Sequence, residues 1–188
     1  MCIRDSDHPM DNFLDFALWR TCRILEPYWL PAFENGTFSK LDANQITFAL
    51  KAVEKPQALQ PLVAMMKANP SNIDSGIVRL VGKIGGVEDL MSLFGVIESG
   101  DNELLEVAGL ALLEAAQDRA LILPQSPKRS SICKKLAQSK RMDSKKAGFR
   151  LIGLWKEDGL AQHIENYLSR PQLESAPAAL SAAEGLGD

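Results

Sequence analysis

The spacing of apolar residues is the feature that most limits what this chain can fold into. Along almost the whole length they recur at intervals of three and four residues, which is the period of an α-helix. Alternating runs typical of strands are nearly absent, and proline, glycine and asparagine interrupt the pattern about once per helix length. The sequence therefore predicts an all-α fold.

The helix boundaries follow from capping residues and helix breakers. Asp42 is a good N-cap for a helix that begins at Ala43, and Ser71 or Asn72 is expected to cap a helix that reaches Ile84. An irregular linker is expected at 121–127. The predicted helices span 10–25, 28–33, 43–53, 56–67, 71–84, 87–98, 101–119, 128–138, 143–155, 160–168 and 173–186.

These helices pair, and the pairs recur along the chain. Similar stretches of small and apolar residues return about thirty residues apart, with one longer step across the 121–127 linker. Small residues at fixed places let neighbouring helices approach closely. A stack of hairpins requires this, because each hairpin buries its apolar face only against its neighbours. The anchors of the repeat are Ala49, Val78, Ala108, Ala147 and Ala178.

The recurring pattern resembles HEAT repeats over about residues 42–188. The resemblance implies a right-handed α-solenoid of about five to six HEAT-like helical hairpins. We assign this helical repeat domain to residues 7–188. Because HEAT signatures are loose, a non-repetitive helical bundle is the alternative.

The N-terminal stretch carries a second resemblance. The segment from Asp7 to Trp19, followed by the segment from Leu25 to Ala32, is similar to the HEAT region of large exported proteins of planctomycete and verrucomicrobial type. Further matches lie at 48–53 and 150–155. In that family a dehydrogenase-like β-propeller precedes the helical region, and a c-type haem domain follows it.

The chain departs from that family where the redox chemistry would be. A c-type haem is attached through Cys-x-x-Cys-His, which does not occur in this sequence, and no strand pattern of a propeller occurs either. The resemblance therefore implies a connector with no cofactor of its own, while haem c would belong to a neighbouring domain of the parent protein. It also implies an exported, periplasmic location.

The first six residues, Met1 to Ser6, resemble a translated sequencing adapter, and a short native arm is the alternative. If these six residues are not native, they do not contribute to the native fold. With an adapter at its start, the chain is expected to be a metagenomic fragment of a longer protein, with its native part beginning at Asp7.

Composition excludes several classes of protein. The formal net charge of −3 gives no overall attraction to nucleic acid or anionic lipid. No apolar run approaches the ~20 residues of a membrane-spanning helix, so no membrane insertion is expected. The three cysteines are far apart and lack the spacing of a zinc site or disulfide framework. Cys22 and Cys133 lie among apolar residues and are expected in the core.

Few residues suggest catalytic chemistry. His8, one of two histidines, is a candidate metal ligand or acid–base group, although we expect it to orient the entry of the first helix. His163 lies near Glu165 and is expected to be solvated. Cys133 would be reactive only in an electropositive, partly exposed setting, which the nearby lysines leave open. The segment 82–86, Gly-Lys-Ile-Gly-Gly, lacks the order of a phosphate-binding loop and predicts a helix end.

Three aromatic residues, Trp19, Tyr28 and Trp29, cluster near the N-terminal end. Large aromatic side chains are enriched at the centres of protein interfaces. They are equally suited to the core of the first hairpin, which is the interpretation that we favour, or to a surface that contacts an upstream domain of the parent protein.

Charge is distributed unevenly. The segment 128–150 carries nine basic residues and one acid, for a net charge of +8, whereas the rest of the chain carries −11. It predicts either a partner-binding basic patch or the solvated face of two helices balanced by acidic neighbours. The candidate partner-binding residues are Lys128, Arg129, Lys134, Lys135, Lys140, Arg141, Lys145 and Lys146, with Arg150 as the ninth base.

The function expected from these features is a non-catalytic scaffold or spacer that binds protein, either neighbouring domains of its own chain or another protein. One alternative is an array that binds nucleic acid or another acidic partner through 128–150, although the segment lacks the interleaved aromatic residues that stack on bases. Another is a HEAT-type tetrapyrrole lyase with His8 or His163 as its acid–base group.

Overall fold

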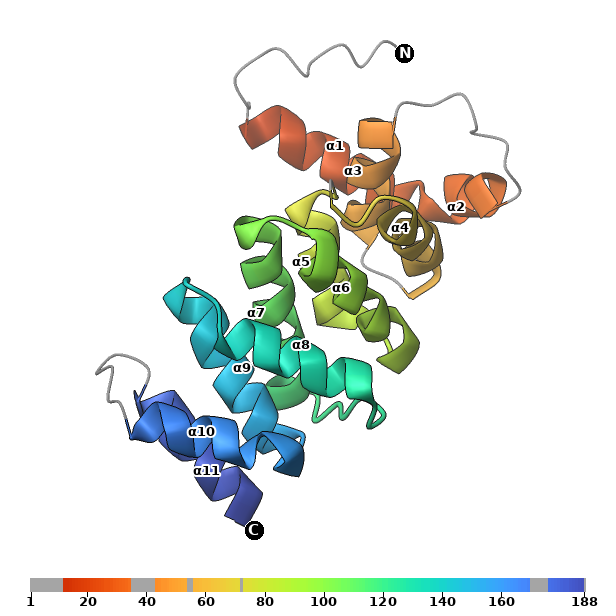
Figure 1. Cartoon of the computed structure of the whole chain (residues 1–188). Coiled ribbons are helices and arrows are strands. Elements are labelled where there is room, and N and C mark those ends of the chain that lie inside the picture. Colours follow the sequence, from red (N-terminus) through yellow and green to blue (C-terminus); the bar gives the residue numbers. More distant parts are fainter. Residues whose placement is uncertain (1–11, 35–42, 54–55, 72, 170–175, 188) are drawn as a thin grey trace. The chain divides into compact units, whose positions relative to one another are not determined.

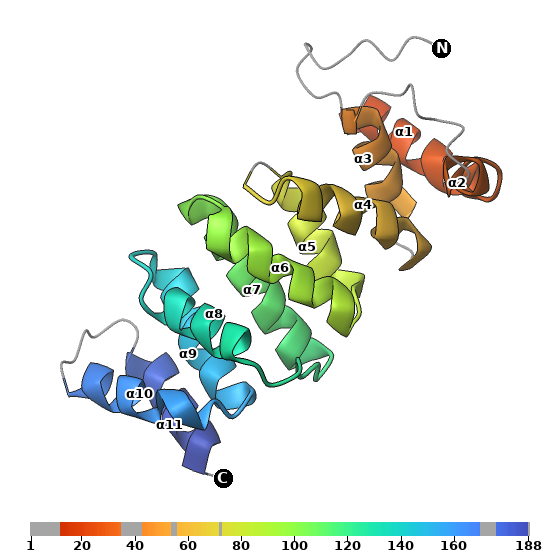
Figure 2. The ribbon, with the colours of Figure 1, turned by 45° about the vertical axis from the view of Figure 1, so that its right-hand side comes forward.

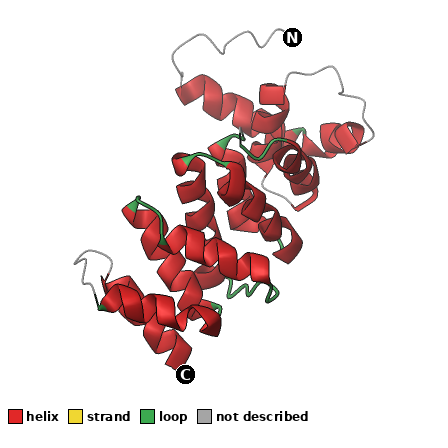
Figure 3. Cartoon of the chain, viewed as in Figure 1, coloured by secondary structure: helices red, strands yellow, loops and turns green. Residues whose placement is uncertain are grey.

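The computed structural model describes residues 12–34, 43–53, 56–71, 73–169 and 176–187, and every regular element within them is helical (Figure 3). The all-α prediction is therefore confirmed for the described part of the chain. The chain divides into two compact units, residues 1–58 and 59–188. Figure 1 labels the helices of both units.

The first unit contains α1 (Asn12–Ile24), α2 (Glu26–Glu34) and α3 (Ala43–Val53). Helix α1 packs against α3 and, more lightly, against α2. Leu50 and Ala52 of α3 are fully buried. Helix α4 (Pro56–Ala68) begins at the end of this unit, and most of it belongs to the second.

The second unit continues with α5 (Ser75–Ile84), α6 (Val87–Ser99), α7 (Asn102–Asp118), α8 (Pro127–Ala137) and α9 (Met142–Leu154). A short 3₁₀ turn, η1 (Asp158–Leu160), leads into α10 (Ala161–Leu168), and α11 (Ala176–Gly187) follows.

Alternate helices of the second unit pack side by side. Helix α5 contacts α7, α7 contacts α9, and α9 contacts α11, while α6 contacts α8 (Figure 2). Consecutive helices also pack together, namely α6 on α7, α8 on α9 and α10 on α11. The core of this unit therefore lies between a row of odd-numbered helices and the even-numbered helices that cover it.

Local chemistry sets the helix ends. The Asp74 side chain caps α5 by accepting hydrogen bonds from the N–H groups of Gly76 (2.8 Å) and Ile77 (3.2 Å). The prediction that Ser71 or Asn72 caps this helix is wrong, because Asp74 is closer to the first turn and its carboxylate is a strong acceptor. The predicted cap Asp42 lies outside the described residues. Gly85 and Gly86 end α5 and precede α6, as the Gly-Lys-Ile-Gly-Gly segment predicted.

Glycines bring the helices close together at three places. A Cβ added at Gly82 of α5 would lie 2.5 Å from the Cβ of Ala111 on α7, and one at Gly109 of α7 would lie 2.6 Å from Leu136 on α8. One at Gly148 of α9 would meet the backbone of Leu136 and Ala137. Such contacts are closer than real Cβ atoms permit, so the α5–α7 and α8–α9 pairs require glycine, whereas at Gly109 the flexible end of the Leu136 side chain could move aside.

In the described residues, no helix is both long enough and apolar enough to pass through a bilayer.

Candidate functional site

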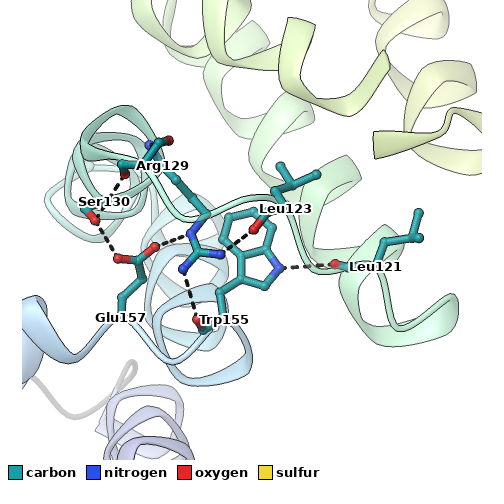
Figure 4. Close-up of polar contacts among 7 residues, drawn as sticks. Leu121, Leu123, Arg129, Ser130, Trp155 and Glu157 are labelled. Carbon is teal, nitrogen blue, oxygen red and sulfur yellow. Dashed lines mark hydrogen bonds and ion pairs between the residues drawn. The ribbon is translucent and has the colours of Figure 1, made fainter. Parts of the chain in front are cut away.

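The basic segment 128–150 is divided between the interior and the surface. Arg129 is only 3% exposed. The expectation that it belongs to a partner-binding surface is wrong, because its guanidinium points into the junction between α8, α9 and the linker before α8 (Figure 4). Residues of the same chain accept the hydrogen bonds of this guanidinium, so it is not available to a binding partner.

Each of the three guanidinium nitrogens of the buried Arg129 forms a hydrogen bond. Its Nε pairs with the carboxylate of Glu157, which is 2% exposed, and its Nη1 donates to the carbonyl oxygen of Leu123. Its Nη2 donates to the carbonyl oxygen of Trp155 at 3.1 Å. A buried ion pair is tolerated only when its remaining donors and acceptors are satisfied. The contacts of Arg129 meet that condition.

Further hydrogen bonds extend this cluster, which we call the Arg129 network and define as Leu121, Leu123, Arg129, Ser130, Trp155 and Glu157 (Figure 4). The hydroxyl of Ser130 donates to the second carboxylate oxygen of Glu157. The indole N–H of Trp155 donates to the carbonyl oxygen of Leu121 at 3.2 Å. The Arg129 guanidinium lies 5.7 Å from the centre of the Trp155 ring. The predicted linker is therefore held against α8 and α9 through its carbonyl groups.

The end of α7, just before the linker, is joined to α5. The Arg119 guanidinium donates to the carbonyl oxygens of Gly85 (2.7 Å) and Gly82 (2.6 Å), which lie at the C-terminal end of that helix. Ala120 and Lys156, which flank the Arg129 network, have φ values of 50° and 51°. Positive φ is costly for residues other than glycine. It persists here because hydrogen bonds fix the backbone on both sides.

Several other bases of the segment have acidic or aromatic neighbours. Lys128 pairs with Glu98 at 3.0 Å, and Arg141 forms a two-contact pair with Glu106. Lys145 lies 5.8 Å from the centre of the Tyr167 ring. For Lys128 and Arg141, the predicted solvated face with acidic neighbours therefore describes the structure better than an open basic patch.

A groove between the start of α7 and the C-terminal half of α8 gathers three of the predicted lysines. Its volume is about 470 Å³, and it is largely open to solvent. Lys134, Lys135 and Lys140 line it. We call it the lysine groove; its other lining residues are Asn102, Leu105, Ser131, Gln138 and Ser139. The basic residues could be found from the sequence, but Asn102 and Leu105 carried no signal, because they come from a helix outside the basic segment.

His163 is not a simply solvated residue. Its ring stacks on Phe149 with centroids 6.4 Å apart, and it is partly buried. Burial, followed by the nearby charge of Lys134, lowers the pKa of this imidazole from its ordinary value of 6.5. The expectation of a polar, solvated face is therefore wrong, since α10 turns this side chain toward α9.

The cysteines follow their environments. Cys133 is fully buried, and burial raises the pKa of its thiol to about 12. The prediction that Cys133 lies in the core is confirmed. The prediction of a reactive thiolate there is wrong, because a thiol with such a pKa stays protonated at neutral pH. Cys22 is only partly buried, so the expectation of a core position holds less well there.

The N-terminal aromatic residues are more exposed than a hairpin core requires. Tyr28 is 79% exposed. Trp19 is partly buried, stacks with Phe16 and lies under the Arg23 guanidinium, which is 4.6 Å from the centre of its ring. Trp29 donates its indole N–H to the carbonyl oxygen of Cys22 at 2.8 Å. The core interpretation is wrong for Tyr28 and holds in part for the two tryptophans.

The remaining candidates are His8 and any cluster of metal-ligating side chains. His8 lies outside the described residues. In the part of the chain that the structure describes, no group of three or more His, Cys, Asp or Glu side chains is placed to hold a metal ion.

Comparison with protein-family models and with curated proteins finds no match to this sequence, and comparison with solved structures finds no match to this fold.

Proposed function

We propose that this chain is a non-catalytic protein-interaction or spacer module built as a right-handed α-solenoid of HEAT-like hairpins. One observation carries the proposal. The repeat anchors Ala49, Val78, Ala108, Ala147 and Ala178 fall on α3, α5, α7, α9 and α11, that is, on every second helix. A non-repetitive bundle has no reason to place them so.

Burial supports the same interpretation. Val78, Ala108 and Ala147 are fully buried, and Ala178 is 5% exposed. The residues four positions later lie on the same helix face and are also buried: Val53, Gly82, Leu112, Leu151 and Ala182. Four of the five repeats therefore bury both positions of this stripe, while in the first repeat Ala49 is only partly buried, and within the second unit successive odd-numbered helices pack against one another. This is the nearest-neighbour packing expected of a repeat array.

Hydrogen exchange on a pair of matched variants tests the array. Leu151→Asp places a charge at a fully buried position of α9, whereas Leu154→Asp changes a residue of the same helix that is 43% exposed. In a repeat array we expect Leu151→Asp to remove protection from α9 and its direct neighbours α7, α8 and α11, and to leave α5, which lies in the same unit but does not pack on α9, protected. Leu154→Asp should leave the pattern nearly unchanged. Simultaneous loss of protection in every helix would mean a single cooperative bundle.

The setting of the module is also a proposal. The resemblance of its N-terminal stretch supports a place in a longer exported protein, between a dehydrogenase-like propeller and a c-type haem domain. Reading the DNA on both sides of the coding segment tests this. A frame that runs past Asp188 to a Cys-x-x-Cys-His motif would support the connector, and a stop codon directly after Asp188 with a native start before Asp7 would contradict it.

The absence of catalysis is tested separately. Purified protein should not turn over sugars, alcohols or tetrapyrroles, and measurable turnover that a Leu151→Asp variant loses would show an enzyme instead.

A further inference from the structure

The lysine groove has one sign of charge. Lys134, Lys135 and Lys140 contribute three ammonium groups, and none of its described lining residues is acidic. Clefts lined by charges of one sign concentrate ligands of the opposite sign.

Three of the carboxylates near the groove are engaged elsewhere, and a fourth, Glu103, interacts electrostatically with Arg141. Glu98 pairs with Lys128 and Glu106 with Arg141, while Asp101 accepts from the backbone N–H groups at the start of α7. Lys135 donates to the backbone carbonyl oxygen of Glu98 at 2.9 Å, a neutral group that leaves the lysine charge uncompensated. Among the described residues, Lys134 and Lys140 form no ion pair. The groove therefore keeps its positive charge.

The uncharged lining groups narrow the kind of ligand. Asn102 and Gln138 carry amides and Ser131 a hydroxyl, and each of these both donates and accepts hydrogen bonds. A peptide backbone offers donors as well as acceptors, whereas a phosphodiester backbone offers only acceptors. No aromatic side chain is present among the described lining residues, so the groove has no surface on which a base could stack.

We propose that the lysine groove binds an acidic peptide segment, a short run rich in aspartate and glutamate on a partner protein. The carboxylates would contact Lys134, Lys135 and Lys140, and the peptide backbone would bond to the amides and hydroxyl. This inference rests on the proposed interaction function and names the class of partner.

Fluorescence anisotropy with a labelled peptide that contains six consecutive glutamates tests the groove, with the all-glutamine peptide as the uncharged comparison. The whole chain is used at low salt. Lys134→Gln combined with Lys140→Gln should weaken binding roughly three- to tenfold, since exposed ion pairs contribute modestly. Lys67→Gln combined with Arg79→Gln removes the same charge from exposed positions on α4 and α5 and should leave the affinity unchanged. Circular dichroism checks that both variants keep their helicity.

Three results would overturn the inference. Equal weakening by both double variants would mean that only overall charge matters. Absence of binding by the glutamate peptide at low salt would mean that the groove does not select carboxylates. Tighter binding of a single-stranded oligonucleotide at the same salt, lost in the groove variant, would assign the groove to nucleic acid. None of these touches the hydrogen-exchange pattern that tests the repeat array, so the two proposals can fail separately.

Discussion

Arg129 and Arg141 belong to the same basic segment, and each pairs with a glutamate from another part of the chain. Arg129 and Glu157 are buried, at 3% and 2% exposure, whereas the Arg141 side chain is 47% exposed. Identical chemistry therefore has different consequences in the Arg129 network and at the surface beside the lysine groove. The Glu106 carboxylate, at 19% exposure, is partly accessible to water when the outer pair is broken, whereas water cannot reach the partner that remains in the interior.

Forming a buried ion pair and breaking it have unequal effects on stability. Forming a buried pair costs desolvation that the attraction only offsets, so the pair adds little net stability. Breaking it leaves one charge buried without a partner. A single substitution in the Arg129 network should therefore cost more free energy of unfolding than the intact pair contributes. The same is not expected of the surface pair.

Removing Arg129 should have the largest effect. Arg129→Met should lower the free energy of unfolding by about 3–5 kcal/mol, because the Glu157 carboxylate and the carbonyl oxygens of Leu123 and Trp155 lose their donor. Urea denaturation followed by circular dichroism measures this. Arg141→Met is the control and should lower the urea midpoint much less, because the remaining Glu106 carboxylate is still partly exposed.

Adding Glu157→Leu to Arg129→Met sharpens the comparison. The double variant removes the unpaired charge and should regain part of the lost stability, though not all, since the two carbonyl oxygens stay without a donor. Equal stability of the Arg129 and Arg141 single variants would show that burial does not separate the two pairs.

A smaller effect is expected from crowding the helix contact beside the network. Gly148→Ala would push a Cβ to 2.8 Å from the carbonyl carbon of Leu136, which is rigid backbone, and should cost about 1–3 kcal/mol. The matched control is Gly159→Ala in the 3₁₀ turn, where no atom lies within 4 Å of the added Cβ. Thermal melts of both variants make the measurement, and an equal shift would contradict the close α8–α9 approach.

Substitution of Ser144 is expected to stabilise the protein, in contrast to the substitutions above. Its hydroxyl on α9 is fully buried and has no hydrogen-bond partner among the described residues. Ser144→Ala should raise the free energy of unfolding by about 1 kcal/mol, because it removes a polar group that lost its water on folding. Ser131→Ala, on the exposed face of α8, is the control and should change little. A loss of stability in Ser144→Ala would mean that the hydroxyl is bonded after all.

The smallest effect concerns pH. The pKa of His163 is lowered in the folded chain, so the unfolded chain binds the proton more readily. Stability is therefore fully present above the ordinary pKa of 6.5 and is lost as the pH falls below it, until the folded pKa is reached. His163→Phe keeps a ring against Phe149 and should lose less stability than the parent chain between about pH 7.5 and about pH 5. Parallel urea titrations at both pH values would contradict this if the two chains changed equally.

Much of the fold could be predicted from local pattern. The apolar period and the helix breakers located the helices, and α3 spans 43–53 as expected. The sequence also located the repeat anchors, and the structure places them on alternate helices. The start of α5 was misplaced because several residues before it can cap a helix, and only the backbone geometry selects Asp74.

The candidate site was less predictable. The basic residues were visible, but the sequence did not separate Arg129 from Lys134 or Lys140, because all three lie among similar neighbours. Glu157 lies 28 residues from Arg129, and no local period links them. Tyr28 was expected in the core, since aromatic residues usually bury their area, yet no described helix covers it enough to do so.

The sequence by itself determined that the chain is helical, where most helices lie, which small residues recur, and that positive charge gathers in 128–150. These properties depend on residues within a few turns of one another. Only the tertiary structure decided which charges are buried, which are paired and which line the groove. Burial and pairing depend on side chains that folding brings together from distant parts of the chain, and the cost of a charge is set by whether water can still reach it.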